Sequence, residues 1–337
     1  MAVPVNRRVT LAARPVGAPE ESDFALDEAP LPKPRPGEVL VHNLYVSVDP
    51  YQRGRMSEAR SYAKPLEIGD VITSQAVGEV LESNDPRFSP GDPVVGQLGW
   101  QEYAVVRGGS LRPVDPAVAP LSAYLHVLGA TGFTAYFGLL DVGRPRPGDT
   151  VVVSAAAGAV GQIAGQLAKL AGCRTVGIAG GPEKADDLRT LFGYDAAIDY
   201  KSEDVTARLR EACPDGVDVY FDNVGGEISA AVHRRLAIGG RVVICGQVST
   251  YNTEGPVERG FDPRLLIVFR ARMEGFLVSD YAHRFAEAER RLVRWLTDGK
   301  LRYREDVAEG LENAPRAFIG MLRGENRGKA LVKVGDT

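Results

Sequence analysis

The chain has 337 residues, with 40 Lys and Arg against 44 Asp and Glu, which gives a formal net charge of -4. Hydrophobic residues make up 44% and charged residues 25%, so intrinsic disorder is excluded. At roughly 150 residues per domain, the length indicates about two globular domains. A mildly acidic chain does not attract nucleic acid or anionic membranes by bulk charge, so we expect neither as a partner.

Cysteine and histidine usage argues against metal and disulfides. Cys173, Cys213 and Cys245 are too few and too far apart for a disulfide framework or a Cys-based zinc site. The N-terminal segment lacks the apolar core of a signal peptide, and the uncharged runs at 116–140 and 150–168 are interrupted by Gly, Ser, Thr or Gln. We therefore expect a cytoplasmic protein that uses no metal.

The first 125 residues contain short alternating apolar runs separated by turns rich in Pro and Gly. Strands are expected at 38–48, 71–81, 93–96 and 102–106. Closely spaced short strands of this kind are typical of an antiparallel barrel or sandwich.

From residue 126 the pattern changes to strands that alternate with helices. Strands are expected at 150–154, 175–179, 196–200, 217–222 and 241–245, with a sixth ending at 275–278. Helices are expected at 161–171, 183–192, 203–212 and 227–236, followed by a long amphipathic helix at 281–299. This alternation predicts an α/β, doubly wound parallel sheet. The tail at 329–334 is expected to be a strand of the first domain, which gives domains of 1–125 with 300–337, and 126–299.

The strand at 150–154 leads into the pattern A-x-x-G-x-x-G, formed by Ala155, Gly158 and Gly161, and then into a helix. Small residues there let the backbone approach a pyrophosphate, and a helix N-terminus supplies N–H donors and partial positive charge. The alternative is a Gly/Ala packing turn with no ligand. A motif that follows a strand and opens a helix favours a dinucleotide site.

The end of the second strand distinguishes between NAD and NADP. No acidic residue stands where NAD sites place one for the ribose 2′-hydroxyl. Lys184 lies just inside the next helix and can pair with a 2′-phosphate, so NADP is favoured. The alternative is that Lys184 is a solvated helix charge, and Glu183 beside it weakens the electrostatic case.

Seven segments carry a resemblance to a known family, and they extend over nearly the whole chain. They are SVDPYQRGRM at 47–56, GATGFTAYFGLL at 129–140, SAAAGAVG at 154–161, YFDNVGGE at 220–227, ICGQVSTYN at 244–252, EGFLVSDY at 274–281 and GENRGKALVKV at 324–334. Together they resemble the zinc-free branch of the medium-chain dehydrogenase/reductase superfamily. Within it they are similar to the leukotriene B4 12-hydroxydehydrogenase / prostaglandin reductase / alkenal double-bond reductase group.

The resemblance implies a GroES-like β-barrel domain, completed by the C-terminal segment, and a Rossmann domain that binds NADP. It also implies a homodimer formed through the sheet edge around 272–278. One segment departs from the group, which commonly has G-M-P-G where this chain has Gly129, Ala130, Thr131 and Gly132. That difference bears on the shape of the substrate site more than on the cofactor.

The resemblance also implies the residues that contact the cofactor. Gly158, Ala159, Val160 and Gly161 would contact the pyrophosphate, and Lys184 and Tyr200 the 2′-phosphate. The residues implied around the ribose and nicotinamide, and elsewhere along the cofactor, are Thr134, Asn223, Cys245, Gly246, Ser249, Phe276, Leu277, Val278 and Asn326.

The chemistry follows from what the first domain lacks. No Cys precedes residue 173, so the usual first zinc ligand of the metal-dependent relatives is missing. Conjugate reduction of an α,β-unsaturated ketone or aldehyde needs only a hydride donor and a hydrogen-bond donor for the enolate oxygen. Tyr251 and Tyr51 are the candidate catalytic donors, and the alternative for both is an aromatic that packs against substrate. Two other functions stay open: an NADP-dependent alcohol dehydrogenase of hydroxy-lipids, and a non-catalytic, crystallin-like NADPH-binding protein.

Overall fold

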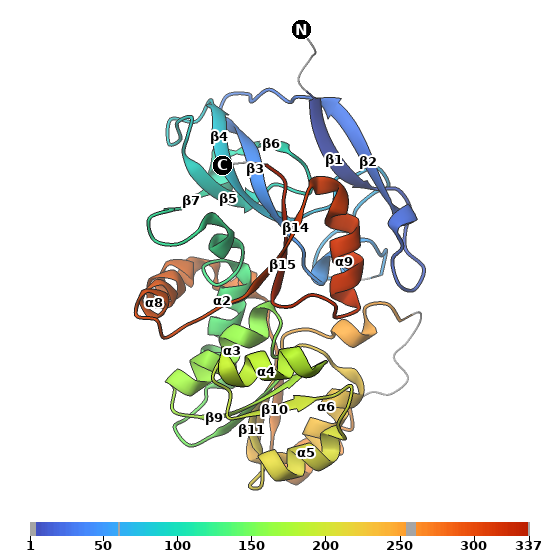
Figure 1. Ribbon diagram of the computed structural model, residues 1–337, viewed down its shortest axis with the longest axis vertical. Helices are drawn as coiled ribbons and strands as arrows, with labels where there is room; N and C mark the ends of the chain where they lie inside the picture. The colour runs from blue at the N-terminus through green and yellow to red at the C-terminus, as the bar shows by residue number, and fades with distance from the viewer. Residues whose placement is uncertain (1–4, 60, 254–260, 336–337) are drawn as a thin grey trace. The chain divides into compact units, whose positions relative to one another are not determined.

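The computed structural model describes residues 5–59, 61–253 and 261–335. The chain forms two compact units (Figure 1). Unit 1 consists of residues 1–126 and 305–337, and unit 2 of residues 127–304. Within the described residues, no helix has both the length and the apolar character that crossing a bilayer requires.

Unit 1 is built mainly of antiparallel strands. Its main sheet has the order β14-β15-β3-β4-β5-β7, with β6 also paired to β3, and β1 and β2 form a separate ribbon. The strands are β1 (Val5–Leu11), β2 (Phe24–Pro30), β3 (Glu38–Ser47), β4 (Gln75–Ser83), β5 (Pro93–Gln97), β6 (Tyr103–Arg107), β7 (Arg112–Pro113), β14 (Glu305–Glu309) and β15 (Lys329–Lys333). Two helices complete it: α1 (Tyr51–Arg55) and α9 (Ala314–Leu322).

The C-terminal strand belongs to unit 1, as its period predicted. β15 pairs antiparallel with β3 and parallel with β14, and the sequence analysis did not anticipate β14. Beside this sheet, α9 contributes Phe318 to a buried aromatic group. The Phe318 ring centroid lies 5.8 Å from that of Trp100 and 6.1 Å from that of Phe24. Aromatic burial of this kind anchors the tail to the rest of unit 1.

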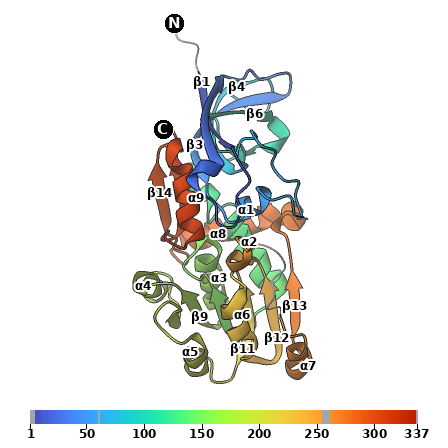
Figure 2. The same cartoon turned by 90° about the vertical axis from the view of Figure 1, so that its right-hand side faces the viewer.

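Unit 2 is a six-stranded parallel sheet with the order β10-β9-β8-β11-β12-β13 (Figure 2). Relative to chain order within the unit this is 3-2-1-4-5-6, the arrangement of the Rossmann fold. The strands are β8 (Thr150–Ser154), β9 (Arg174–Ala179), β10 (Ala196–Asp199), β11 (Val217–Asp222), β12 (Leu236–Ile244) and β13 (Arg272–Gly275). The helices are α2 (Ala130–Phe137), α3 (Ala159–Leu170), α4 (Pro182–Thr190), α5 (Val205–Ala212), α6 (Gly226–His233), α7 (Arg264–Phe269) and α8 (Phe285–Thr297). The predicted α/β doubly wound sheet is confirmed.

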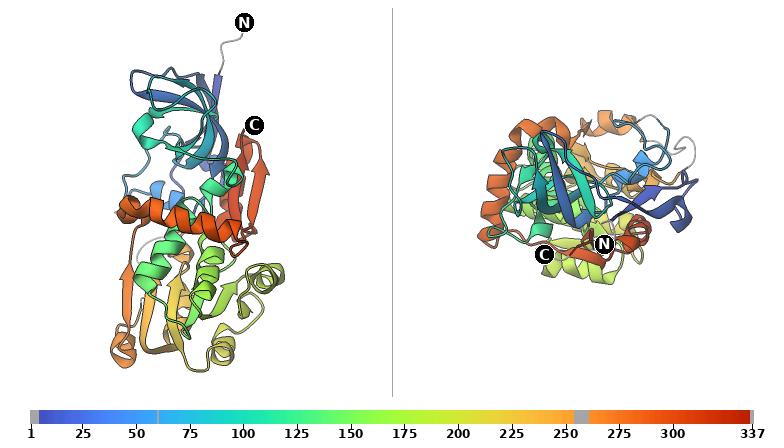
Figure 3. Two further views of the ribbon diagram at one scale, coloured as in Figure 1. Left: turned by 90° about the vertical axis from the view of Figure 1, so that its left-hand side faces the viewer. Right: turned by 90° about the horizontal axis from the view of Figure 1, so that it is seen from above.

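Most of these elements have the predicted positions, and four differ. β13 ends at Gly275, so residues 276–278 are not part of the sixth strand, and α6 ends at His233 rather than at residue 236. β8 and β11 have the predicted bounds, whereas β12 begins five residues before the expected 241. The added segment contains Gly239 and Gly240, which have low strand propensity and concealed it. The expected helix at 281–299 is a 3₁₀ turn (Val278–Arg284) followed by α8, which packs against α2 within unit 2 (Figure 3, left).

Candidate functional site

The turn between β8 and α3 is folded too tightly for larger side chains. A Cβ atom on Gly161 would lie 2.4 Å from the carbonyl oxygen of Ala155, and one on Gly158 would lie 3.1 Å from it. Ala155 itself has a positive φ of 46°, which a non-glycine residue seldom adopts. This small-residue turn brings backbone N–H groups and the start of α3 together at the carboxyl end of β8. A turn of this kind has the geometry that a dinucleotide pyrophosphate requires.

A buried tyrosine fixes the start of α3. The Tyr194 hydroxyl donates to the Gly161 carbonyl oxygen at 2.7 Å. Its ring packs closely against the same helix, because a Cβ on Gly165 would be 1.9 Å from the Tyr194 Cζ atom. Burial raises the pKa of Tyr194, so the hydroxyl keeps its proton and remains a donor. The Tyr194 side chain thus also stabilises the turn between β8 and α3.

Tyr200 and Lys184 flank the end of β9. A Cβ on Gly180 would lie 2.8 Å from the Tyr200 Cζ atom, so the tyrosine ring covers that glycine, and Tyr200 remains 42% exposed. The next residue, Gly181, has φ +99° and caps α4, whose first turn contains Lys184. A phenol and an ammonium group therefore follow neighbouring parallel strands, next to the turn after β8.

Asp199, at the end of β10, was missed by the sequence analysis. Its carboxylate is buried and accepts hydrogen bonds from Gly181 N at 2.7 Å, Lys201 N at 3.0 Å and Ser202 Oγ at 2.8 Å. Burial raises its pKa, but these hydrogen bonds outweigh burial and leave the pKa below its usual value. The carboxylate therefore shapes the loop under Lys184 and Tyr200. An acidic residue as the last position of a buried strand was the signal that could have identified it.

Asp222, at the end of β11, accepts hydrogen bonds from several segments of the candidate site. Its carboxylate is fully buried and joins three strand ends. Oδ1 accepts hydrogen bonds from the Ser154 and Tyr220 hydroxyls and from the N–H groups of Val224 and Gly225, all at 2.9–3.1 Å. Oδ2 accepts from Ser229 Oγ at 2.6 Å and Gln247 Nε2 at 3.3 Å. The segment YFDNVGGE was part of the family resemblance, but the role of this aspartate was not predicted.

The loops after β11 and β12 are tied to one another through Asp222 and its neighbours. Asn223 donates from Nδ2 to the Ser154 carbonyl oxygen at 2.7 Å. The N–H groups of Cys245 and Gly246 both donate to the Asp222 carbonyl oxygen, at 2.8 and 3.1 Å. Ser249 Oγ donates to the Val224 carbonyl oxygen at 2.6 Å. These predicted cofactor residues are therefore held together at the carboxyl edge of the sheet, where doubly wound folds bind nucleotides.

Tyr251 lies on the same edge. It follows a 3₁₀ turn, Val248–Thr250, and its hydroxyl accepts from Gln247 N at 3.5 Å. A Cβ on Gly246 would lie 3.5 Å from that hydroxyl. The phenol therefore stands beside the loop that contains Cys245 and Gly246. A proton donor at this position can serve a substrate that reacts next to a bound nicotinamide.

The side chains of two other residues predicted to contact the cofactor, Phe276 and Thr134, make contacts within unit 2. A Cβ on Gly138 would lie 2.4 Å from the Phe276 Cζ atom, so that ring packs against the end of α2. Thr134 donates from Oγ1 to the Ala130 carbonyl oxygen of its own helix at 2.7 Å. The Phe276 ring is therefore in contact with unit 2 itself, at the end of α2.

Tyr51 and Asn326 belong to unit 1. Tyr51 begins α1, and its buried hydroxyl makes no hydrogen bond of normal geometry within the described residues. Burial, and next the Asp49 carboxylate, raise the pKa of Tyr51, so this phenol stays protonated and can donate. Asn326 donates from Nδ2 to the Gly328 carbonyl oxygen at 2.6 Å, which orders the loop before β15.

A buried lysine connects these two segments of unit 1. Lys329 Nζ donates to the carbonyl oxygens of Val48 at 2.7 Å and Ala330 at 3.0 Å, and to Asp49 Oδ1 at 2.9 Å. The side chain is only 1% exposed, and burial lowers its pKa, with Asp49 opposing that effect. Lys329 thus holds the Tyr51 turn against the strand that follows Asn326. The sequence analysis gave Lys329 no role.

The described residues contain no cluster of three His, Cys, Asp or Glu side chains placed to hold a metal ion. Each of the three cysteines is free, and each thiol is held in its neutral form. Burial raises the pKa of Cys173 and Cys213 to about 11 and that of Cys245 to about 12. Because the thiolate is the nucleophilic form, Cys245 is not activated for covalent catalysis.

We predict that all three thiols react slowly with a disulfide reagent in the native protein at pH 8. That pH lies well below the pKa values of about 11 to 12, so the thiolate fraction is very small. Titration before and after unfolding in denaturant measures the effect, and three thiols should become reactive on unfolding. Rapid labelling of Cys245 in the folded protein would contradict its neutral state.

The comparisons with known proteins agree with this geometry. Family models described as "N-terminal domain of oxidoreductase" and "Zinc-binding dehydrogenase" match residues 7–114 and 159–295. The chain is 50% identical to a putative NADP-dependent oxidoreductase, YfmJ, of Bacillus subtilis, over 98% of both chains. It is 44% identical to the NADP(+)-dependent 2-alkenal reductase of Nicotiana tabacum, over 98% of this chain and 97% of the relative.

One of the solved structures is also similar to this chain over its full length. CurA from Vibrio vulnificus in complex with NADPH superposes with a TM-score of 0.94 at 44% identity, over 98% of this chain and 100% of that chain. Identity of this level over the full length shows common descent, and the two-domain fold with its glycine turn agrees with it. The chain belongs to the medium-chain dehydrogenase/reductase superfamily, in its zinc-free double-bond reductase group.

Proposed function

We propose that this protein reduces the C=C bond of α,β-unsaturated ketones and aldehydes with NADPH. The observation that carries the proposal is the placement of Tyr251 beside the Cys245–Gly246 loop, at the nucleotide-binding edge of the sheet. The 2-alkenal reductase and the NADPH complex among its relatives support the same substrate class and cofactor.

The chain's own residues account for cofactor binding. The turn from Gly158 to Gly161 and the start of α3 take the pyrophosphate through backbone N–H groups and the helix dipole. Lys184 and the partly exposed Tyr200 take the 2′-phosphate, and the buried Asp199 holds the loop between them. Asn223, Ser249 and the backbone at 276–278 complete the nicotinamide end of the site.

Bound NADPH supplies the hydride for the β-carbon. The negative charge that then develops on the carbonyl oxygen requires a donor that is already in place. Tyr251 is our first candidate because its phenol is protonated at neutral pH and Asp222 holds the loop against which its hydroxyl lies. Tyr51 is the second candidate, with a pKa raised by burial. The α-carbon receives its proton from one of these groups or from water.

We predict that Lys184→Ala weakens NADPH binding about 10- to 100-fold and leaves NADH binding nearly unchanged, because a charge-assisted contact to the 2′-phosphate is lost. Calorimetric titration of each coenzyme measures both affinities. Lys169→Ala is the matched control, since Lys169 pairs with Asp195 at 2.7 Å at the far end of α3. Equal losses for NADPH and NADH, or a wild-type preference for NADH, would refute the assignment.

We predict that the wild-type protein oxidises NADPH with small enones and enals, and that Tyr251→Phe lowers kcat by about 10²-fold. NADPH affinity should be retained, because the phenol contacts the substrate oxygen. Absence of turnover across a broad panel despite tight NADPH binding favours the crystallin-like alternative. Faster reaction of NADP with hydroxy-lipids than of NADPH with enones favours the alcohol dehydrogenase.

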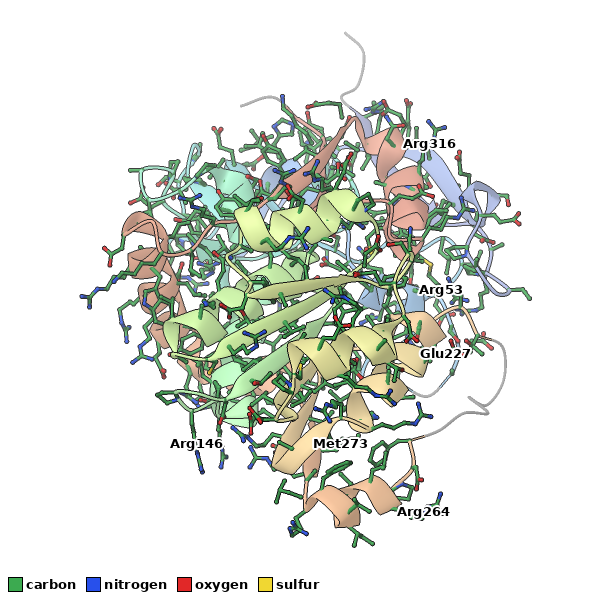
Figure 4. The ribbon with its side chains drawn as sticks, turned by 60° about the horizontal axis from the view of Figure 1, so that its bottom comes forward. Arg53, Arg146, Glu227, Arg264, Met273 and Arg316 are labelled. Carbon is green, nitrogen blue, oxygen red and sulfur yellow. The ribbon has the colours of Figure 1, made fainter. Side chains whose placement is uncertain are left out.

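The edge of the unit 2 sheet is the proposed dimer interface. β13 is the last strand of the sheet and pairs with β12. Figure 4 shows α7, which begins at Arg264, next to the strand that carries Met273. Ile267 and Val268 on α7 are 78% and 57% exposed, an apolar surface suited to a second copy of the chain. The free cysteines and the dependence on NADPH support a cytoplasmic location.

We predict a homodimer in solution that the double substitution Ile267→Asp with Val268→Asp converts to monomer, since two charges would be buried in the interface. Size-exclusion chromatography with light scattering measures the mass. Val16→Asp is the control, because Val16 is 81% exposed and belongs to unit 1, the unit that does not contain α7. A wild-type monomer, or a double variant that stays dimeric, rules out this interface.

A further inference from the structure

We propose that Arg304 is a positioning residue for NADPH. It holds α4, which carries Lys184, in a fixed relation to α3, whose first turn takes the pyrophosphate. The inference rests on the proposed function, because it needs the contact between Lys184 and the 2′-phosphate. Arg304 and the residues that hold it belong to unit 2.

Two glutamines of α3 bind the chain at 302–304 as a neighbouring strand would. Gln162 Oε1 accepts from the Arg304 N–H at 2.8 Å, and its Nε2 donates to the Arg304 carbonyl oxygen at 3.2 Å. Gln166 makes the same two bonds with the backbone of Arg302, both at 2.8 Å. Residues four apart on a helix rise about 6 Å, and alternate residues of an extended chain lie about 6.6 Å apart. The two side-chain amides therefore match the spacing of the two backbone residues.

These amides are buried, which makes the attachment firm. Gln162 is 0% exposed and Gln166 is 6% exposed. Gln166 Nε2 also donates to the Gln162 carbonyl oxygen at 2.7 Å, which fixes the orientation of its amide. Release of the segment 302–304 would leave buried amide groups without these partners, which is costly. The backbone of Arg304 is therefore fixed beside Gln162, which directly follows Gly161 of the pyrophosphate turn.

The side chain of Arg304 extends this attachment to α4. Its Nη1 atom lies 3.4 Å from Asp187 Oδ2, and the two side chains are 35% and 5% exposed, so solvent screens the pair only in part. Asp187 follows Lys184 by three residues on α4, and residues at this spacing are neighbours on a helix surface. Arg304 thus connects the first turn of α3 to the part of α4 that carries Lys184.

The two coenzymes depend on this connection to different degrees. In NADPH one ribose carries both the 2′-phosphate and the link to the pyrophosphate, so α3 and α4 must keep a matching separation to bind both. A charge-assisted hydrogen bond requires about 2.7–2.9 Å between donor and acceptor, so a small displacement of α4 weakens the contact with Lys184. NADH has no 2′-phosphate and does not depend on that contact. Arg304 should therefore favour NADPH over NADH without touching either coenzyme.

The test measures the Kd of NADPH and of NADH by calorimetric titration of the full-length protein. We expect Arg304→Met, which keeps an apolar stem, to raise the Kd of NADPH about 10-fold and to leave that of NADH within about 2-fold of the wild type. Arg304→Lys should recover part of the NADPH affinity. In a Lys184→Ala background, Arg304→Met should change the Kd of NADPH very little, because Arg304 acts through Lys184.

Arg302→Met is the matched control. It removes the same charge from the same segment, but the Arg302 side chain is exposed and its bonds to Gln166 are made by backbone atoms. The control should keep the wild-type ratio of the two Kd values.

Three results overturn the inference and leave the assignment of Lys184 intact. They are an unchanged Kd of NADPH in Arg304→Met, effects of Arg304→Met and Lys184→Ala that are fully additive, and an equal rise in Kd for both coenzymes. An equal rise would mean that Arg304 stabilises unit 2 as a whole. If Lys184→Ala by itself leaves the Kd of NADPH unchanged, the assignment of the 2′-phosphate site is refuted, and the inference fails with it.

Discussion

The nucleotide-binding edge of unit 2 depends on one buried carboxylate. Asp222 accepts hydrogen bonds from residues of β8, β11, α6 and the loop after β12, so these segments share a single acceptor. A buried charge is tolerable only when its acceptor positions are filled, and here all the donors belong to segments that must stand together to bind a dinucleotide. The loop that precedes Tyr251 is also held by Asp222, through Gln247. Asp222 therefore fixes the geometry of the site through its hydrogen bonds to these segments, although we do not expect its carboxylate to touch cofactor or substrate.

The parallel sheet could be predicted from sequence because its strands are continuous apolar runs. TVVVS at 150–154 and VDVYFD at 217–222 gave the bounds of β8 and β11 to the residue. The family resemblance then supplied the residues around the glycine turn. Asp199, Asp222 and Lys329 escaped prediction because their roles depend on partners that are distant in sequence. Lys329, for example, pairs with a residue 280 positions away. A spacing pattern within one segment carries no information about such a partner.

Unit 1 was harder to predict for a related reason. Its strands are short, and their pairing follows turns rather than periodicity, so β1, β2 and β14 were not anticipated. The polar groups around α1 show the same limit. Arg53 and Arg55 look alike in the sequence QRGR, yet Arg53 donates to backbone carbonyl oxygens, whereas the Arg55 Nε atom has no hydrogen-bond acceptor among the described residues. Only the three-dimensional arrangement separates two arginines whose surroundings differ in this way.

The position of β15 has a consequence for how the chain is made. The last strand in the sequence lies between β14 and β3, inside the sheet, and brings Lys329 to its buried partners. During synthesis on the ribosome, residues 1–126 emerge without this interior strand and cannot complete their sheet. Residues 127–304 form a continuous unit and can fold while the rest is still being translated. Until residues 329–333 arrive, the open edge of β3 is exposed to chaperones and to wrong pairing.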